Sequence, residues 1–284
     1  MNYSEFLLQT AEANKSIACL GLDPVLEKIP AKGNSVEEKI TNFYSEIINA
    51  CVSSGVLPGA CKPNYAFYAQ YGWDGLRALR NVCALVKENV FPLILDAKRG
   101  DIGKTSDAYA KEVFEFWGVD AVTVAPYMGA DSVLPFIKWS EKYGKGVYVL
   151  NRTSNEGAKE LQNLDVKGEP LYIVVSRKIT EWGKNASGNV GAVVGATNIS
   201  ELQRIHDFFS GQSFSAPYLI PGVGGQGGSA KEVFSVLSKK GNAGIHRINS
   251  SSAINYAYEK NNDSDYAGAA VNALKELNNE IGFS

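Results

Sequence analysis

The stretch VFPLILDAKRGDIGKT, residues 90–105, predicts a strand and a group of charged side chains that follows it. Its first six residues form a short apolar run, which indicates a buried strand. Asp96 and Lys98 come next, two positions apart, so in an extended chain their side chains point to the same side. Asp101 follows Gly100, where the backbone can turn sharply. The stretch therefore predicts two carboxylates and one ammonium group in a small volume, as in many active sites. A salt-bridged cap on a turn is the structural alternative.

Size and composition limit the class of protein. The chain has 284 residues, 45% of them hydrophobic, which is enough for a sizeable core. Its net charge of −2 gives no basic footprint, so we expect no nucleic-acid partner. No apolar run approaches the length of a membrane span, and residues 1–15 lack a signal-peptide pattern. We therefore expect a cytoplasmic protein that makes no contact with a membrane.

The cysteines and histidines do not indicate a metal site. The four cysteines show no ligand spacing, and Cys19 and Cys61 fall in predicted strands, where they act as small core residues. This usage suits a reducing cytoplasm. The two histidines, His206 and His246, have no histidine or cysteine partner at ligand spacing. We expect no bound metal.

Apolar strand patterns alternate with helical patterns along the whole chain. The predicted strands are residues 16–22, 59–61, 90–95, 119–125, 146–150, 190–195, 217–220 and 245–249. The predicted helices are residues 36–52, 72–86, 106–117, 132–143, 171–182, 199–209, 230–238 and 267–280. Eight such units predict an α/β protein with the (β/α)₈ TIM-barrel fold, as one domain over residues 1–284. An open, doubly wound sheet is the alternative, disfavoured because polar residues end nearly every strand. Residues 151–169 are expected to form an irregular excursion.

Polar side chains at the strand ends are the candidate functional residues, because barrel enzymes carry their chemistry there. The candidates are Asp23, Lys62, Asn64, Asp96, Lys98, Asp101, Pro126, Ser154, Gln226 and the serines after Asn249. A glycine-rich stretch, residues 221–228, lies between a strand and a helix, where backbone N–H groups can hold a phosphate. Its spacing fits neither a Walker loop nor a dinucleotide fingerprint, so we expect a small phosphoester. A flexible loop is the alternative.

Several of these motifs, taken in order, resemble those of the orotidine 5′-phosphate decarboxylases. They are GLDP at residues 21–24, KPN at 62–64, DAKRGDIGKT at 96–105, TVAPY at 123–127 and PGVGGQG at 221–227. RTSN at residues 152–155 and the chain length resemble the longer bacterial and archaeal-type branch. The resemblance implies a homodimeric (β/α)₈ barrel that converts orotidine 5′-monophosphate to UMP in pyrimidine biosynthesis. It also implies that no metal and no organic cofactor takes part.

The resemblance further assigns roles to residues of this chain. Lys98 is the implied proton donor to C6 of the pyrimidine, and Asp96 lies against the departing carboxylate and holds Lys98. Asp101 and Thr105 are implied to reach into the site of the partner subunit. The implied substrate contacts are Asp23 and Lys62 to ribose hydroxyls, Ser154 to the pyrimidine, and Gln226 to the phosphate and the pyrimidine edge. Further expected substrate-binding positions are Asn64, Pro126, Pro221, Gly224, Gly225 and Ser252.

One position departs from the family pattern. After the last strand the family carries an arginine that binds the phosphate, whereas this chain has Ser252 there. Arg247 lies upstream in the strand, and we expect that it cannot reach the same place. Because an arginine–phosphate pair is a strong polar contact, this change bears on substrate affinity.

Two other functions stay open at this point. One is a Mg²⁺-dependent sugar-phosphate decarboxylase or synthase of the same superfamily, which would need further carboxylates at strand ends. The other, motivated by Ser252, is a nucleotide-binding barrel that is catalytically weakened or silent.

Overall fold

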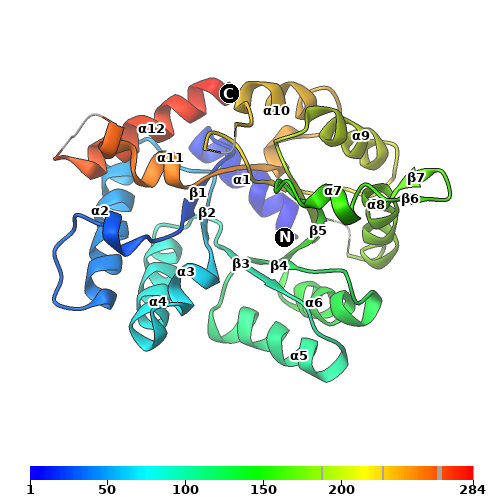
Figure 1. The fold of residues 1–284 in the computed structure, drawn as a ribbon, viewed down its shortest axis with the longest axis horizontal. Coiled ribbons are helices and arrows are strands. Elements are labelled where there is room, and N and C mark those ends of the chain that lie inside the picture. Colours follow the sequence, from blue (N-terminus) through cyan, green and yellow to red (C-terminus); the bar gives the residue numbers. More distant parts are fainter. Residues whose placement is uncertain (187, 226, 261–263, 284) are drawn as a thin grey trace.

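Eight parallel strands form the centre of the molecule (Figure 1). The structure is a computed structural model that describes residues 1–186, 188–225, 227–260 and 264–283. The strands are β1 (Ala18–Leu22), β2 (Ala60–Pro63), β3 (Ile94–Arg99), β4 (Ala121–Val124), β5 (Gly146–Arg152), β8 (Val190–Val194), β9 (Tyr218–Ile220) and β10 (Arg247–Ser250). They are hydrogen-bonded in the order β2-β1-β10-β9-β8-β5-β4-β3. Two isolated parallel bridges, Cys61 to Leu93 and Asn64 to Asp96, join β2 to β3 and close the barrel.

Helices surround this barrel, as Figure 1 shows. They are α2 (Val36–Ser54), α4 (Gly72–Glu88), α5 (Gly103–Lys111), α6 (Ala130–Tyr143), α8 (Leu171–Trp182), α9 (Ile199–Ser210), α10 (Ala230–Leu237) and α12 (Tyr266–Ile281). A π-helical turn, Glu112–Phe116, continues α5. Each of these helices follows one strand and precedes the next around the ring. The predicted TIM-barrel fold is therefore confirmed.

Helix α2 illustrates why these segments fold where they do. The side chain of Ser35 accepts a hydrogen bond from the Glu38 N–H and caps the amino end. Gly55 ends the helix with φ +71°, a backbone conformation that glycine adopts without strain. Its buried face includes the residues that the helical period predicts, namely Ile40, Phe43, Ile47 and Ile48. Burying four such side chains contributes about 1.5–3 kcal/mol each.

A helix that the strand–helix pattern did not predict, α1 (Tyr3–Asn14), closes the amino-terminal end of the barrel. Asn2 and Glu5 form a reciprocal capping box at its start. Tyr3 and Leu7 pack with side chains inside the barrel. The buried guanidinium of Arg247 donates to the Leu7 carbonyl (2.6 Å) and to Thr10 Oγ1 (3.0 Å), which ties α1 to β10. In Figure 1 this helix lies across the middle of the ring, behind the strands.

Short elements complete the loops. They are η1 (Leu26–Lys28), α3 (Tyr65–Ala69), α7 (Ala158–Leu161), the hairpin β6 (Asp165–Val166) with β7 (Glu169–Pro170), η3 (Ala243–Ile245), α11 (Ser252–Asn255) and η4 (Ala257–Lys260). The predicted excursion after β5 is thus a short helix and a hairpin. Cys19 and Cys61 are buried and free, as expected for core residues. In the described part of the chain, no helix combines the length and apolar character needed to cross a membrane.

Strand β3, which carries Asp96 and Lys98, begins later and ends later than the predicted strand at residues 90–95. Strand β3 starts at Ile94, because Val90 has φ +58° and is still in the turn after α4. The strand continues through Arg99, so Asp96 and Lys98 lie within it. Its register with β4 shifts between Leu95 and Arg99, which is the mark of a bulge.

Candidate active site

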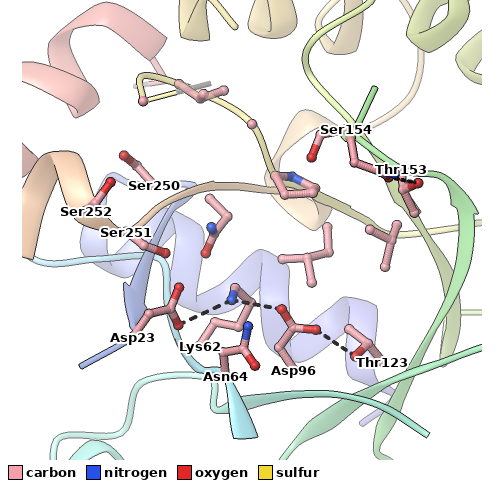
Figure 2. Close-up of a pocket in the computed structure, with 18 of the residues that line it drawn as sticks. Asp23, Lys62, Asn64, Asp96, Thr123, Thr153, Ser154, Ser250, Ser251 and Ser252 are labelled. Atoms are coloured by element: carbon pink, nitrogen blue, oxygen red, sulfur yellow. Dashed lines mark hydrogen bonds and ion pairs between the residues drawn. The ribbon is translucent and has the colours of Figure 1, made fainter. Parts of the chain in front are cut away.

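A pocket of about 740 Å³ lies at the carboxyl ends of the strands (Figure 2). Its lining includes three groups of residues. The charged cluster consists of Asp23, Lys62, Asp96 and Lys98. The apolar wall consists of Leu150, Val193 and Leu219. The serine–glycine lobe consists of Gly222, Val223, Gly225, Ser250, Ser251 and Ser252. The pocket is large enough for a nucleotide-sized ligand.

Positive and negative groups alternate along the charged cluster. Lys62 Nζ lies 3.9 Å from Asp23 Oδ1 and 3.1 Å from Asp96 Oδ2. Lys98 Nζ lies 2.7 Å from Asp96 Oδ1, which also accepts a hydrogen bond of 2.9 Å from Thr123 Oγ1. Figure 2 shows Asp23, Lys62, Asp96 and Thr123 joined in this sequence. Asp96 is therefore held between two ammonium groups, each supplied by the carboxyl-terminal part of a strand.

The cluster keeps its buried members charged. Burial opposes ionisation of Asp96, but Lys62 and then Lys98 outweigh it and hold the pKa of Asp96 well below its ordinary value. Burial likewise opposes the charge on Lys62, but Asp23 and then Asp96 raise the pKa of Lys62 above its ordinary value. The site consequently presents fixed charges at neutral pH.

The backbone at Lys98 turns its side chain toward the open part of the pocket. Lys98 has φ +46°, a left-handed conformation that is uncommon for a residue with a Cβ. Its N–H donates to Thr123 Oγ1 at 2.9 Å, so the hydroxyl that supports Asp96 also fixes this turn. The Lys98 side chain is 48% exposed, whereas that of Asp96 is 12% exposed. The ammonium group is thus anchored on Asp96 and remains accessible from the pocket.

Arg99 of the same motif serves the fold instead of the pocket. Its guanidinium donates to Glu112 at 2.8 and 3.0 Å and stacks on the rings of Tyr65 and Tyr109. These contacts fix the end of β3 against α3 and α5.

Of the other predicted site residues, five line the pocket: Asn64, Ser154, Pro221, Gly225 and Ser252. Asn64 also caps α3, because its Oδ1 accepts from the Ala66 N–H at 3.2 Å. The Ser154 carbonyl accepts from Thr197 Oγ1 at 3.2 Å. A Cβ at Gly195 would lie 2.7 Å from Ser154 Cα, so only glycine allows this close approach.

Asp101 does not join the charged cluster of its own chain. Its Oδ1 accepts from the Ile102 N–H at 2.8 Å, and its carbonyl accepts from Ser106 Oγ at 2.6 Å. Three more predicted positions, Thr105, Pro126 and Gly224, do not line the pocket. Gln226 lies outside the described residues.

The serine–glycine lobe has no cationic side chain of its own among the described residues. Lys62 and Lys98 are the cations of the described lining, and both belong to the charged cluster. Gly222 and Gly224 have φ +99° and +77°, conformations that leave this loop dependent on glycine. The Ser252 hydroxyl lies 3.3 Å from the position of a Cβ at Gly225, so the serine run and the glycine loop face each other closely.

Arg247 lies at the opposite end of the barrel and does not replace the missing arginine. Its guanidinium is fully buried and donates to carbonyl oxygens of Gly59, Gly244 and His246 as well as to α1. The expectation that Arg247 cannot reach the position of Ser252 agrees with this geometry.

Sequence reasoning missed the pocket residues that lie one layer deeper in the barrel. These are Thr123, Leu150, Val193, Leu219 and Asn249, together with Tyr256 beyond β10. The alternation of side chains along each predicted strand could have identified some of them, because every second residue of a barrel strand faces inward. Within the described residues, no group of three His, Cys, Asp or Glu side chains is placed to hold a metal ion.

Comparison with known families agrees with this geometry. Residues 19–265 match the model of the orotidine 5′-phosphate decarboxylase / HUMPS family. The chain belongs to this family. The sequence resemblance, which rested on five short motifs, is therefore confirmed over most of the chain.

Individual members of the orotidine 5′-phosphate decarboxylase / HUMPS family are similar over most or all of their length. An orotidine 5′-phosphate decarboxylase of Thermomicrobium roseum is 45% identical over 230 residues, which cover 80% of this chain and 78% of that protein. One of a Janthinobacterium species is 40% identical over 287 residues, covering 99% and 98%. The structure of Leishmania donovani OMP decarboxylase superposes with a TM-score of 0.79 at 32% identity and covers 100% of both chains.

Proposed function

We propose that this protein decarboxylates orotidine 5′-monophosphate to UMP, a reaction of pyrimidine biosynthesis. The observation that carries the proposal is the Asp96 carboxylate between the ammonium groups of Lys62 (3.1 Å) and Lys98 (2.7 Å). Family membership supports the same reaction. The cluster lies in a pocket whose apolar wall lowers the local dielectric and so strengthens its fields.

Lys98 is the proposed proton donor. In the reaction the bond between C6 and the carboxylate carbon breaks, CO₂ leaves, and the electron pair stays on C6. The ammonium group of Lys98 stabilises this developing negative charge more than it stabilises the substrate, and then transfers a proton to C6. Asp96 keeps Lys98 in place through the 2.7 Å contact. Solvent can return the proton, because the Lys98 side chain is half exposed. The step as written needs no metal and no organic cofactor.

The remaining pocket residues are proposed to hold the substrate. Asp23 and Lys62 would bind ribose hydroxyls. Ser154 faces them across the pocket and would contact the pyrimidine (Figure 2). Backbone groups of the glycine loop, with Ser252, would bind the phosphate. Binding energy from this remote phosphate can be spent on ordering the site for the chemical step.

A homodimer is part of the proposal. Ile102 is 52% exposed, Met128 is 46% exposed and Tyr127 is 90% exposed, and all three follow the ends of β3 and β4. Such a group of apolar side chains is typical of a surface that a second copy covers. Asp101 and Thr105 flank it, so we propose that they reach into the pocket of the partner. We also propose that residues 1–284 act as one barrel domain in the cytoplasm.

A spectrophotometric assay tests the reaction. Purified protein should remove the ultraviolet absorbance of orotidine 5′-monophosphate and form UMP, at the same rate with and without EDTA. Loss of this activity in EDTA, restored by Mg²⁺, would contradict the metal-free step.

A second candidate is a nucleotide-binding barrel without turnover, favoured by the serine at position 252. In that case UMP binds and absorbance does not change. Absence of both UMP binding and turnover would reject both functions.

A further inference from the structure

Asn249 is a buried pocket residue whose side-chain oxygen has no hydrogen-bond partner among the described residues. It is 7% exposed and lines the pocket. Its Oδ1 is buried and has no hydrogen-bond partner among the described residues. A buried amide oxygen without a partner costs free energy, so a native structure keeps one where something else satisfies it.

The other buried asparagines of the described chain each make a side-chain hydrogen bond within the protein, although Oδ1 of Asn151 and of Asn255 also lacks a partner. Asn151 donates to Ser176 Oγ at 2.7 Å, and Asn255 donates to the Gly21 carbonyl at 2.9 Å. Asn189 accepts from the Tyr3 N–H at 2.8 Å. Each of these three supports the fold through a protein contact. Asn249 has no such role.

The neighbours of Asn249 in the barrel indicate which part of a ligand would lie against it. On β10 it pairs with Cys19 of β1, whose side chain packs inside the barrel. The next inward position on β1 is Gly21, which pairs with Lys62, and the Ser251 side chain takes the place that a Cβ there would need. Asn249 thus lies between Lys62 on one side and the serine–glycine lobe on the other, and Ser250 follows it directly.

We infer that the Asn249 amide binds the sugar–ester part of a nucleoside monophosphate. This inference rests on the proposed function. A ligand that contacts Lys62 with its ribose hydroxyls and the serine–glycine lobe with its phosphate must cross Asn249. An amide suits this span, because its N–H groups can donate to a ring or ester oxygen and its carbonyl can accept from a hydroxyl. With no cationic side chain in the lobe, the amide supplies a donor where the pocket has few.

The test compares two substitutions of buried asparagines. Asn249→Leu removes the amide and keeps the side-chain volume, whereas Asn151→Leu does the same outside the pocket. We expect Asn249→Leu to weaken UMP binding about 5- to 150-fold, the range for leaving one polar ligand group unpaired. The Tm of its ligand-free form should stay unchanged or rise. Asn151→Leu should lower Tm, because it loses the bond to Ser176, and should bind UMP as the wild type does.

Two further measurements locate the contact and guard against a misfolded variant. Ribose 5-phosphate, which has no base, should lose affinity for Asn249→Leu by a factor similar to that of UMP. Asn249→Asp keeps the shape of the side chain but loses the N–H donors, so it too should bind UMP more weakly than the wild type. Calorimetric titration measures the affinity of each variant for UMP and for ribose 5-phosphate.

The outcomes separate this inference from the proposed function. Wild-type protein that neither binds UMP nor turns over the substrate refutes the proposed function. Wild-type protein that binds UMP, with Asn249→Leu or a folded Asn249→Asp binding equally well, refutes the role of Asn249. Unchanged affinity for ribose 5-phosphate places the contact elsewhere and also overturns it. A fall in Tm for Asn249→Leu as large as that for Asn151→Leu makes the residue structural.

Discussion

Replacing Lys62 by methionine removes the central positive charge of the charged cluster and keeps a side chain of similar length. Lys62 Nζ lies between Asp23 Oδ1 (3.9 Å) and Asp96 Oδ2 (3.1 Å), and only 4% of its side chain is exposed. The substitution leaves two carboxylates at the pocket floor with Lys98 as their remaining cation. We therefore expect Lys62→Met to destabilise the fold.

The size of the effect follows from the burial of the pair. Removing one partner of a buried ion pair costs about 3–5 kcal/mol, because the other charge stays buried and uncompensated. At about 2.1 cal/mol/K per residue, a chain of this length has an unfolding entropy of roughly 0.6 kcal/mol/K. Lys62→Met should then lower Tm by about 5–8 °C.

A surface ion pair provides the matched control. Lys28 Nζ lies 2.6 Å from Glu259, with side chains that are 44% and 41% exposed. Lys28→Met removes the same charge at the surface, where such a pair contributes at most about 1 kcal/mol, so Tm should fall by less than about 2 °C. Differential scanning calorimetry at pH 7 measures both. Equal shifts for the two variants, or a rise in Tm for Lys62→Met, would refute the assignment of a buried, mutually stabilising cluster.

The stability difference between the wild type and Lys62→Met should depend on pH, because it arises from the charges of Lys62 and Asp96. The pKa of Asp96 is lowered in the folded state, so its stabilisation is present above the unfolded value near 3.9 and is lost as pH falls. The pKa of Lys62 is raised, so its stabilisation is present below about 10.4 and is lost at higher pH. The difference between wild type and Lys62→Met should be constant from about pH 5 to 9 and should shrink toward pH 3. A difference that grows toward pH 3 would contradict this cause.

Three further predictions concern the phosphate, the histidines and the dimer. Ser252→Arg should tighten UMP binding about 5- to 150-fold by a new charge-assisted contact with the phosphate. Unchanged or weaker binding would show that the phosphate does not lie near position 252. Burial lowers the pKa of His206, and burial, with His206 and Arg247 nearby, lowers that of His246 further. The unfolded chain therefore binds more protons, and the unfolding free energy should fall below pH 6.5 by up to about 1.4 kcal/mol per pH unit for each histidine. Denaturant titrations from pH 7 to 5 test this, and a profile unchanged in the double His→Gln variant would reject it. Mixing inactive Lys98→Ala and Asp101→Asn chains should restore about one quarter of wild-type activity, because about half the dimers are mixed and each then has one intact site. No recovery despite proven subunit exchange would rule out a shared site.

The barrel could be predicted because its signals are local. Each strand is a short apolar run and each helix has one apolar face, so the alternation of the two can be counted along the sequence. Helix α1 escaped because its apolar pattern is weak, and the capping box of Asn2 and Glu5 was the remaining sign of it. The start of β3 was misplaced because apolar residues such as Val90 also occur in the turn that precedes a strand.

The site could be predicted where one strand supplies it and not where several do. Asp96 and Lys98 lie on β3, so their spacing was informative. The contact of Lys62 with Asp23 depends on the pairing of β1 with β2, and the pocket position of Asn249 depends on the register of β10. These contacts arise only when the strands pair to form the barrel, so the sequence of a single strand does not reveal them. The proposed place of Asp101 in the pocket of a partner subunit rests on family resemblance, because the sequence of one chain does not otherwise indicate it.

The turnover of Lys98→Ala tests the central claim most directly. In the wild type, the ammonium group of Lys98 lies 2.7 Å from the Asp96 carboxylate and is open to the pocket. Without it the protein should lose at least several orders of magnitude in kcat for orotidine 5′-monophosphate, because both charge stabilisation and the proton source are gone. UMP binding, measured by calorimetry on the same sample, should remain. A folded Lys98→Ala protein that keeps a tenth of the wild-type kcat would contradict the assignment of Lys98 as the proton donor.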